Sequence, residues 1–469
     1  MKKTSIICSF FLLLNCLLLA QNVLIKGIAT GAEGKTLSLY KLSDPYTQTQ
    51  LKLASGEIDS AGKFSFSFKT DLTFLGYLKI GFSQAPFYVE PGKTYDLSIS
   101  CSDCNSSDDK TNPYLNPKQL SIFIINSDST ELNNIVNRFD DLYDDFILKH
   151  YESLLKHRKK PVLDTFRLIV DKHFSFVNNE YFKNFVKYRF ATIEFIAKLA
   201  GNEIIAKKYI LKQPVLYNNT AYLEFFDEFF NNYVTSVSNK ITKNDLYNAV
   251  NLEKSFLTLM DSLGKDSILR NEVVRELVAL KCLGEIYYDK DYNKQSILDM
   301  LKYVAENSKF TQHRQIAENY IKLLTKLTIG TKAPDFSLKD FQGTSYSLSE
   351  LNKDKYVYLI FWTTWCVPCI AEMELIGKLK TKYGTKVEFV GISTDKEFLT
   401  YYYFMKKNKT FDFITLHWGN NTEFLDNYNV KTYPNFVLIG TDGKIVQYPA
   451  DTPSTYLDAL LFNLTKIKN

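Results

Sequence analysis

Residues 356–375 read YVYLIFWTTWCVPCIAEMEL. The first seven positions form an apolar run with the length and composition of a strand that is buried on both faces. Cys366 and Cys369 follow closely, at the point where a helical pattern begins. A Cys-x-x-Cys pair that opens a helix after a buried strand is a strong signal for redox chemistry. This stretch therefore predicts an α/β domain with a reactive dithiol.

The position of the two cysteines on the expected helix predicts their roles. A thiol at a helix N-terminus faces unpaired backbone N–H groups and the positive end of the helix dipole, which stabilise its thiolate. We expect Cys366 to be the nucleophile. Cys369 lies one turn further in and is expected to resolve a mixed disulfide between Cys366 and a substrate sulfur.

A static disulfide and half of a zinc site are the structural alternatives for this pair. A zinc site needs about four ligands, and no second Cys-x-x-Cys or paired His lies nearby in the sequence. A static disulfide would require neither Trp365 before the pair nor a helix that starts there. We therefore expect a redox-active disulfide between Cys366 and Cys369, with no metal and no cofactor.

The rest of the last third of the chain alternates strands with helices, which is typical of an α/β layer structure. Gly384 is expected to end the helix that carries the cysteines. Nearly every element of a thioredoxin fold has a candidate in residues 328–469. The expected elements are a hairpin at 335–348, strands at 356–362, 387–392, 411–416, 436–439 and 445–448, and helices at 366–383, 401–407, 424–428 and from 453 onward.

Two further motifs belong to this domain. Residues 330–336 read GTKAPDF and precede the expected hairpin, and residues 432–435 read TYPN before the apolar strand FVLI. Together with FWTTWCVPC, they resemble the TlpA/ResA-like, AhpC/TSA-related branch of the thioredoxin superfamily. Its members are periplasmic or membrane-facing thiol-disulfide oxidoreductases. The resemblance covers about 140 residues, from Thr328 to Asn469.

The resemblance implies a substrate-binding surface beside the dithiol. In this family the proline equivalent to Pro434 is cis and faces the cysteine pair, and the backbone of the preceding residue binds an extended substrate as an added strand. We therefore expect Trp365, Tyr433 and Pro434 to contact substrate. Without the resemblance, Tyr-Pro before a strand is also typical of a simple turn.

The resemblance also implies a carboxylate three residues after the second cysteine, and Glu372 occupies that position. It would accept the proton of the Cys369 thiol. The alternative is an exposed first-turn Glu that favours the helix dipole. Thioredoxins themselves bury an Asp six residues before the first cysteine, where this sequence has Ile360. This departure makes Glu372 the candidate substitute.

Peroxiredoxins share the fold and are the nearest alternative enzymes. Thr363 lies three residues before Cys366, as their T-x-x-C motif requires, but Leu359 stands where they need a proline. The paired CVPC is not their pattern either. We therefore favour the thiol-disulfide oxidoreductase.

The start of the chain predicts export. Lys2 and Lys3 precede an apolar run over residues 6–19, and Ala20 precedes a polar residue, which is the pattern of a secretory signal peptide over residues 1–20. An uncleaved membrane anchor is the alternative. No later apolar run reaches the roughly 18 residues needed to span a bilayer. We expect an exported, periplasmic protein, with membrane association left open.

The composition excludes some partners. The formal charge is +5, and loss of Lys2 and Lys3 would leave about +3 on a chain this long, too little to indicate nucleic-acid binding. The hydrophobic share of 45% and charged share of 23% are typical of a globular protein.

Two regions precede the α/β domain. Residues 22–126 alternate short apolar-polar stretches with glycine-rich turns, which predicts a β-sandwich. They resemble the β-rich module of unknown function that often precedes this type of domain. Residues 128–326 carry apolar residues at helical spacing and predict a helical region. Its aromatic stretches, such as YLEFFDEFFNNYV, are typical of a helical core rather than of a ligand-binding face. These regions could position the redox domain, recognise the client or mediate dimerisation.

The other cysteines and the histidines carry no predicted chemistry. Cys101 and Cys104 are expected to form a small loop disulfide, with a second redox centre as the alternative. Cys282 is the expected unpaired thiol. No metal-ligand spacing is present among the histidines, which are His150, His157, His173, His313 and His417.

We therefore expect an extracytoplasmic thiol-disulfide oxidoreductase that reduces client disulfides and is itself reduced by an upstream electron donor, such as a membrane thiol reductase. Reduction is favoured because the family typically reduces apocytochromes or other clients, a step of cytochrome c maturation. Oxidation or isomerisation of clients is the alternative direction. A different class of function is a binding module with a passive thioredoxin-fold scaffold.

Overall fold

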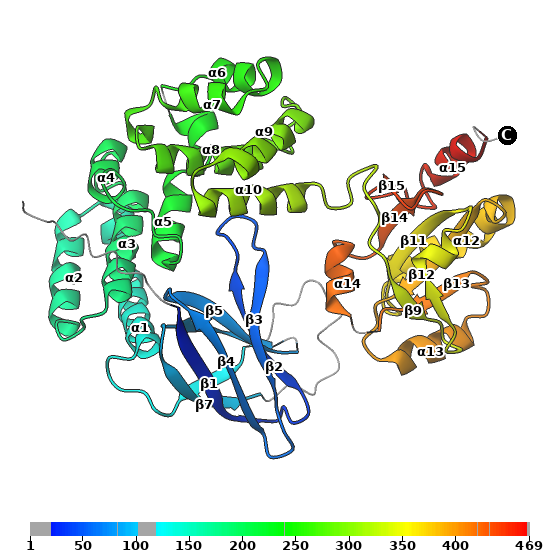
Figure 1. The fold of residues 1–469 in the computed structure, drawn as a ribbon, viewed down its shortest axis with the longest axis horizontal. Helices are drawn as coiled ribbons and strands as arrows, with labels where there is room; N and C mark the ends of the chain where they lie inside the picture. The colour runs from blue at the N-terminus through cyan, green and yellow to red at the C-terminus, as the bar shows by residue number, and fades with distance from the viewer. Residues whose placement is uncertain are drawn as a thin grey trace, which may run out of the picture.

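The computed structural model describes residues 20–81, 83–101, 119–238, 240–419, 421–430 and 432–466. Residues 1–19 of the predicted signal peptide and Cys104 of the predicted loop disulfide lie outside the described residues, so both stay predictions. Figure 1 shows a β-rich region, a helical region and a C-terminal α/β domain, in chain order. The predicted multidomain fold class is confirmed. Among the described residues, no helix is long and apolar enough to cross a membrane.

In the β-rich region, apolar and polar residues alternate and build two sheets around one core. Phe64 and Phe66 of β4 are buried, and the serines between and after them are exposed. The described strands form sheets of order β4-β1-β7-β8 and β3-β2-β5-β6. Ile25 of the first sheet and Leu39 of the second share the core. The strands are β1 (Gln21–Thr30), β2 (Thr36–Leu42), β3 (Gln50–Glu57), β4 (Lys63–Thr70), β5 (Phe74–Ile80), β6 (Ser83–Val89), β7 (Thr94–Ser100) and β8 (Ser121–Ile124).

The helical region has an aromatic-rich core. Phe225 and Phe226, from the stretch YLEFFDEFFNNYV, are almost fully buried, so the prediction that these aromatics form core is confirmed. Cys282 is buried and unpaired, as predicted. The α-helices are α1 (Leu132–Tyr151), α2 (Lys160–His173), α3 (Glu180–Ile196), α4 (Asn202–Tyr209), α5 (Thr220–Phe229), α6 (Lys243–Tyr247), α7 (Phe256–Leu263), α8 (Glu272–Ile286), α9 (Lys294–Asn307) and α10 (Thr311–Leu324).

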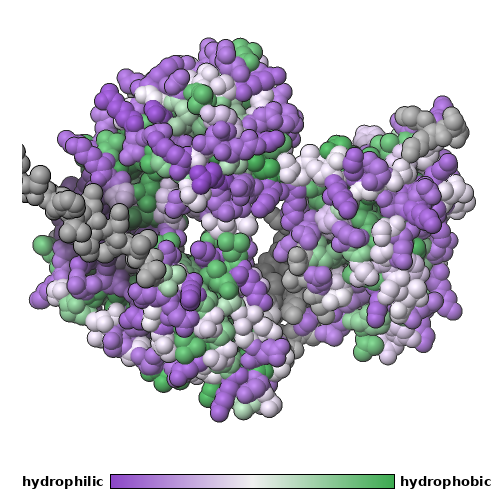
Figure 2. All heavy atoms as spheres, in the orientation of Figure 1, coloured by the Kyte–Doolittle hydropathy of each residue, from purple (hydrophilic) through white to green (hydrophobic). Residues whose placement is uncertain are grey.

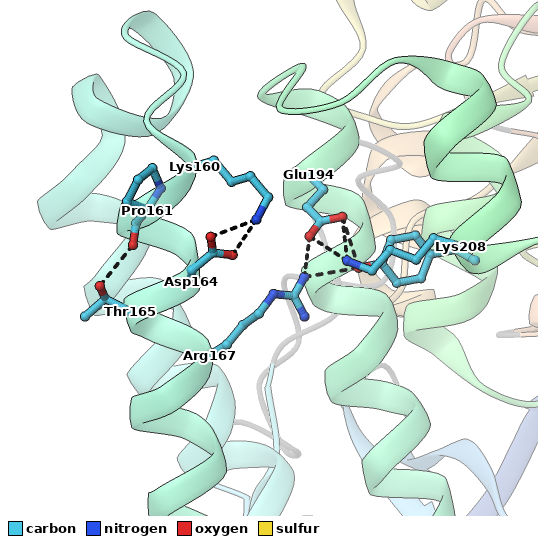
Figure 3. Close-up of polar contacts among 8 residues, drawn as sticks. Lys160, Pro161, Asp164, Thr165, Arg167, Glu194 and Lys208 are labelled. Carbon is cyan, nitrogen blue, oxygen red and sulfur yellow. Dashed lines mark hydrogen bonds and ion pairs between the residues drawn. The ribbon is translucent and has the colours of Figure 1, made fainter.

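Charged side chains lie mainly at the surface, and most of the face in Figure 2 is hydrophilic. Glu194 of α3 is a buried exception, and its carboxylate joins three helices (Figure 3). Arg167 of α2 lies 2.7 Å away and Lys208 of α4 lies 2.9 Å away, and the Tyr209 hydroxyl donates at 3.1 Å. A buried charge is tolerated when it is paired in this way.

The β-sandwich is tied to the helical region by the loop between β2 and β3, which reaches α10 in Figure 1. The Tyr46 ring stacks on Tyr320 with centroids 6.3 Å apart. Beside them, Asn319 donates its amide to the Asp44 carboxylate at 2.7 Å. The two N-terminal regions therefore share a specific contact.

The C-terminal domain is built on a sheet of order β10-β9-β13-β12-β11-β14-β15 among the described residues. Strand β11 lies inside this sheet and pairs in parallel with β12 and antiparallel with β14. The elements are β9 (Ser337–Lys339), β10 (Ser345–Ser347), α11 (Leu348–Leu351), β11 (Tyr356–Trp362), α12 (Val367–Tyr383), β12 (Val387–Ser393), α13 (Phe398–Lys407), β13 (Ile414–His417), α14 (Thr422–Asn427), β14 (Asn435–Ile439), β15 (Ile445–Gln447) and α15 (Leu457–Lys466).

Strand β11 is buried on both faces, as its continuous apolar run predicts. Ile360 packs in one core with Met373 of α12, and Phe361 packs in the other with Tyr428. Because both faces are covered, the end of β11 holds the loop that follows it in a fixed place. That loop carries the cysteines.

Candidate active site

The two cysteines meet in a disulfide at the start of α12, with Cα atoms 5.2 Å apart. Cys366 is the N-cap of the helix, and its Sγ accepts a hydrogen bond from the backbone N–H of Cys369 at 3.2 Å. Cys366 is 5% exposed and Cys369 is fully buried. A sulfur that approaches from solvent therefore meets Cys366 first.

The sequence around the pair explains why the helix begins there. Strand β11 ends at Trp362, and a turn follows in which the Cys366 N–H donates to the Thr363 carbonyl at 3.1 Å. Pro368 lies in the first turn of α12. Proline costs nothing at that position, since its missing N–H would have had no partner within the helix.

The predicted substrate-binding residues lie together beside the cysteine loop. The Tyr433–Pro434 peptide bond is cis, as the resemblance implied. It precedes β14, whose first residue pairs with Phe361 near the end of β11. The Trp365 ring meets the Tyr433 ring edge-on, with centroids 6.1 Å apart, and Trp365 is 53% exposed. The structure thus brings all three predicted substrate-binding residues together beside the cysteine loop.

Comparison with known proteins identifies the family of this domain. The family model described as the AhpC/TSA family matches residues 329–448. The thiol-disulfide oxidoreductase ResA of Bacillus cereus strain ZK / E33L is 35% identical over 123 residues, which cover 26% of this chain and 69% of that protein. The chain belongs to the ResA-like thiol-disulfide oxidoreductases. The predicted family and enzyme class are thereby confirmed.

Other similar proteins carry the same description. ResA of Bacillus subtilis strain 168 is 29% identical over 167 residues, which cover 35% of this chain and 86% of that protein. A crystal structure described as a thiol-disulfide oxidoreductase from Bacteroides vulgatus is 30% identical and covers 30% of this chain and 98% of its own, with a TM-score of 0.28. The AhpC/TSA match of this ResA-like chain lies within its C-terminal domain.

Glu372 of this ResA-like oxidoreductase lies on α12, where the turn before α15 holds it. Its carboxylate accepts hydrogen bonds from the backbone N–H of Ser454 at 2.9 Å and from the Ser454 hydroxyl at 2.5 Å. Within the described residues, no hydrogen bond joins it to either cysteine. Burial, reinforced by the charge of Glu372, raises the pKa of Tyr358 on β11. The predicted role of Glu372 as proton acceptor for the Cys369 thiol stays a prediction.

Sequence reasoning missed Asp395, which the structure places beside the cysteine loop of the ResA-like domain. Its side chain is almost fully buried after β12. Thr364 donates its backbone N–H and its hydroxyl to the carboxylate, and Ser393 donates its hydroxyl at 2.8 Å. The available signal was its position, since β11 and β12 are parallel neighbours and polar residues that follow such strands meet at one edge of the sheet.

The histidines of the ResA-like chain form no metal site among the described residues, where no cluster of His, Cys, Asp or Glu is arranged to hold an ion. His417 is buried, and its Nε2 lies 2.6 Å from the main-chain oxygen of Asp395. Its Nδ1 accepts the backbone N–H of Gly419 at 3.2 Å. Burial lowers the pKa of His417. These bonds suit a neutral ring that braces the loop after β12.

Proposed function

We propose that this oxidoreductase reduces disulfide bonds in client proteins, with Cys366 as nucleophile and Cys369 as resolving cysteine. The observation that carries the proposal is the unequal setting of the two sulfurs. Cys366 is the N-cap of α12 and is 5% exposed, whereas Cys369 is fully buried. Backbone N–H groups and the helix dipole favour a thiolate at the N-cap. Attack by Cys366 and release by Cys369 is the order that this setting supports.

The proposed exchange moves two electrons from the dithiol to the client. The Cys366 thiolate attacks one sulfur of a client disulfide, a new S–S bond forms, and the other client sulfur leaves as a thiolate. The Cys369 thiol loses its proton, which we propose Glu372 accepts, and its thiolate attacks the Cys366 sulfur. The client leaves as a dithiol after protonation, and Cys366 and Cys369 are left as a disulfide.

Trp365, Tyr433 and Pro434 are the proposed client-binding residues. An extended client segment would pair with the backbone of Tyr433, as a strand added at an edge. The half-exposed Trp365 ring, packed against Tyr433, offers an apolar contact next to Cys366. Recognition through backbone and apolar contact would accept clients of varied sequence.

The proposed setting is outside the cytoplasm. The signal-like pattern of residues 1–20 supports export to the periplasm, with or without membrane attachment. Each turnover leaves the pair oxidised, so an upstream electron donor, such as a membrane thiol reductase, is part of the proposal. Apocytochromes and other proteins with disulfides are the proposed client class.

The direction of electron flow is tested by the redox equilibrium of the full chain in graded glutathione buffers. Fluorescence of Trp362 and Trp365 follows the reaction, and mass spectrometry confirms the state of the pair. A potential near or below about −220 mV supports a reductant, whereas one near about −120 mV would make the protein an oxidant of exported chains.

The alternative that the thioredoxin fold is only a passive scaffold is tested by removing the nucleophile. The Cys366→Ser variant is expected to lose disulfide reduction and cellular complementation completely. Cys282→Ala is the matched control, because Cys282 is a buried unpaired thiol in α8, outside the redox domain. Complementation by Cys366→Ser would instead favour a binding function of the N-terminal regions.

A further inference from the structure

The loop after β12 is fastened to the loop that carries the nucleophile. Thr364, two residues before Cys366, directs its backbone N–H at both oxygens of the Asp395 carboxylate, at 3.1 and 3.0 Å. The Thr364 hydroxyl donates to Oδ1 at 2.8 Å. Asp395 thus binds both donors of one residue of the cysteine loop. A carboxylate held by several such bonds has little freedom to move away.

The same turn also reaches the substrate-binding loop. Thr394 is fully buried, and its N–H and hydroxyl both donate to the Trp362 carbonyl, at 2.8 and 3.1 Å. The Tyr433 side chain meets the Thr394 side chain, and burial raises the pKa of Tyr433 to about 12. Residues 393–395 therefore connect the end of β11, the cysteine loop and the loop of the cis proline.

The hydrogen-bond partners of the Asp395 carboxylate are neutral groups. Asp395 is 4% exposed, and hydroxyl and amide groups of Thr364 and Ser393 hydrogen-bond its carboxylate. From β13, His417 bonds the main-chain oxygen and has a pKa lowered by burial, so its ring is neutral near pH 7. Lys396 and Glu397 follow in the chain. Among the described residues, no cation is hydrogen-bonded to this carboxylate.

We propose that Asp395 is a positioning residue that sets the redox equilibrium of the Cys366–Cys369 pair. It fixes the cysteine loop through Thr364, and its buried negative charge disfavours the neighbouring Cys366 thiolate. This inference rests on the proposed function of the pair and deepens it.

The sign of the effect follows from electrostatics. A nearby negative charge disfavours a second one, so it raises the pKa of a thiol. A less stable thiolate means a less stable reduced pair, and the equilibrium moves toward the disulfide. The dithiol therefore becomes a stronger electron donor. Asp395 biases the pair toward reduction of clients, against the helix dipole that favours the thiolate.

The test compares the full chain with its Asp395→Asn variant, in which the amide keeps the shape and can still accept from Thr364. Both are equilibrated with reduced and oxidised glutathione, where two glutathione thiols reduce one protein disulfide and form one glutathione disulfide. The variant is expected to favour the dithiol by about tenfold, a rise of about 30 mV in potential. The pKa of the Cys366 thiol, read from the pH profile of its alkylation, is expected to fall.

A second variant is expected to shift the redox equilibrium in the opposite direction. Ser393→Ala keeps Asp395 but removes one hydroxyl donor from its carboxylate, so the unscreened charge is expected to favour the disulfide by about threefold. Opposite shifts in the two variants cannot come from general loosening of the loop. Should Asp395→Asn fail to fold, the Ser393→Ala shift decides alone, and a value within the error of the parent overturns the proposal.

A control variant removes a carboxylate of the same domain that, among the described residues, has no hydrogen bond to the cysteine loop. Asp458→Asn removes an exposed carboxylate of α15 that is bonded to Lys382, and it is expected to leave the equilibrium unchanged. An equal shift in this control, or no shift in Asp395→Asn, overturns the role of Asp395. If the unmodified protein proves to be an oxidant, the proposed direction of electron flow fails, yet the ratio between variant and parent still tests Asp395.

Discussion

The two sulfurs of the active pair differ in access although they lie three residues apart. Cys366 keeps a small exposed surface at the N-cap of α12, and Cys369 is fully buried. Access decides which cysteine can exchange with a large client, because exchange requires approach along the S–S axis. The resolving step, by contrast, needs only a neighbour within the protein.

Removal of the resolving thiol alone is expected to trap the intermediate. In Cys369→Ser, the mixed disulfide between Cys366 and a client has no internal nucleophile to release it. Non-reducing gels and mass spectrometry of the variant, mixed with a disulfide-containing peptide, are expected to show a covalent adduct at Cys366. Cys366→Ser should form none, and an adduct at Cys369 in that variant would reverse the assigned roles.

Trp365 is expected to contribute to client binding and not to stability. About half of its surface is exposed, so Trp365→Ala removes little burial on folding. Loss of an interfacial aromatic typically costs about 1–2 kcal/mol of binding, which corresponds to a rise of roughly 5- to 30-fold in KM for a protein disulfide. Steady-state kinetics measures this, with exposed Tyr456→Ala as the control. A lower kcat with unchanged KM would contradict a binding role.

Residues whose partners lie close in sequence could be predicted from local pattern, whereas the distant pair Trp365 and Tyr433 could be predicted only through the family resemblance. The roles of Cys366 and Cys369 depend on the start of one helix, and that pattern is local. The contact of Thr364 with Asp395 spans 31 residues, and the contact of Glu372 with Ser454 spans 82. Such pairs form only when the sheet and helices have packed, so the sequence pattern alone does not reveal them.

At the scale of elements, the strand and helix order of the C-terminal domain could be predicted because each burial pattern is continuous along its own segment. Strand β11 is buried on both faces and reads as an unbroken apolar run. Helix α12 ends at Tyr383 and Gly384 is its C-cap, as predicted, but with φ of −59° it does not adopt the left-handed conformation that usually selects glycine there. The predicted end of the helix is confirmed, and Gly384 ends it in an ordinary helical conformation.

His417, at the end of β13, is expected to make the stability of the C-terminal domain sensitive to acid. Burial lowers its pKa below the unfolded value of about 6.5. The folded state then binds fewer protons than the unfolded state below that pH, so stability falls as the pH drops, by at most about 1.4 kcal/mol for each pH unit. Above about pH 7 the residue contributes no pH dependence.

Denaturant unfolding followed by tryptophan fluorescence at several values between pH 5 and pH 8 measures this dependence. His417→Gln keeps a hydrogen-bond donor for the main-chain oxygen of Asp395 and cannot titrate, so its stability is expected to fall less steeply. Equal slopes for the variant and the parent would show that other groups cause the acid sensitivity.

At the scale of the whole molecule, the β-sandwich and the helical region are joined by side chains that no local pattern marks. Tyr46 lies in the loop between β2 and β3, stacks on Tyr320 and has Lys281 5.7 Å above its ring. Asp44 of the same loop binds Asn319. These partners are more than 200 residues apart, which is why the sequence predicted two regions and not their contact. The arrangement suggests that the two regions unfold together.

Tyr46→Ala is expected to weaken that coupling and leave the redox chemistry intact. Loss of a partly buried aromatic at a contact between regions should cost about 2–4 kcal/mol, and a single unfolding transition of the N-terminal regions should separate into two. Urea unfolding followed by circular dichroism, with limited proteolysis of the β2–β3 loop, measures both effects. The glutathione equilibrium of Cys366 and Cys369 should match that of the parent, because the contact lies in other regions of the chain. A shifted equilibrium would instead mean that the N-terminal regions tune the dithiol.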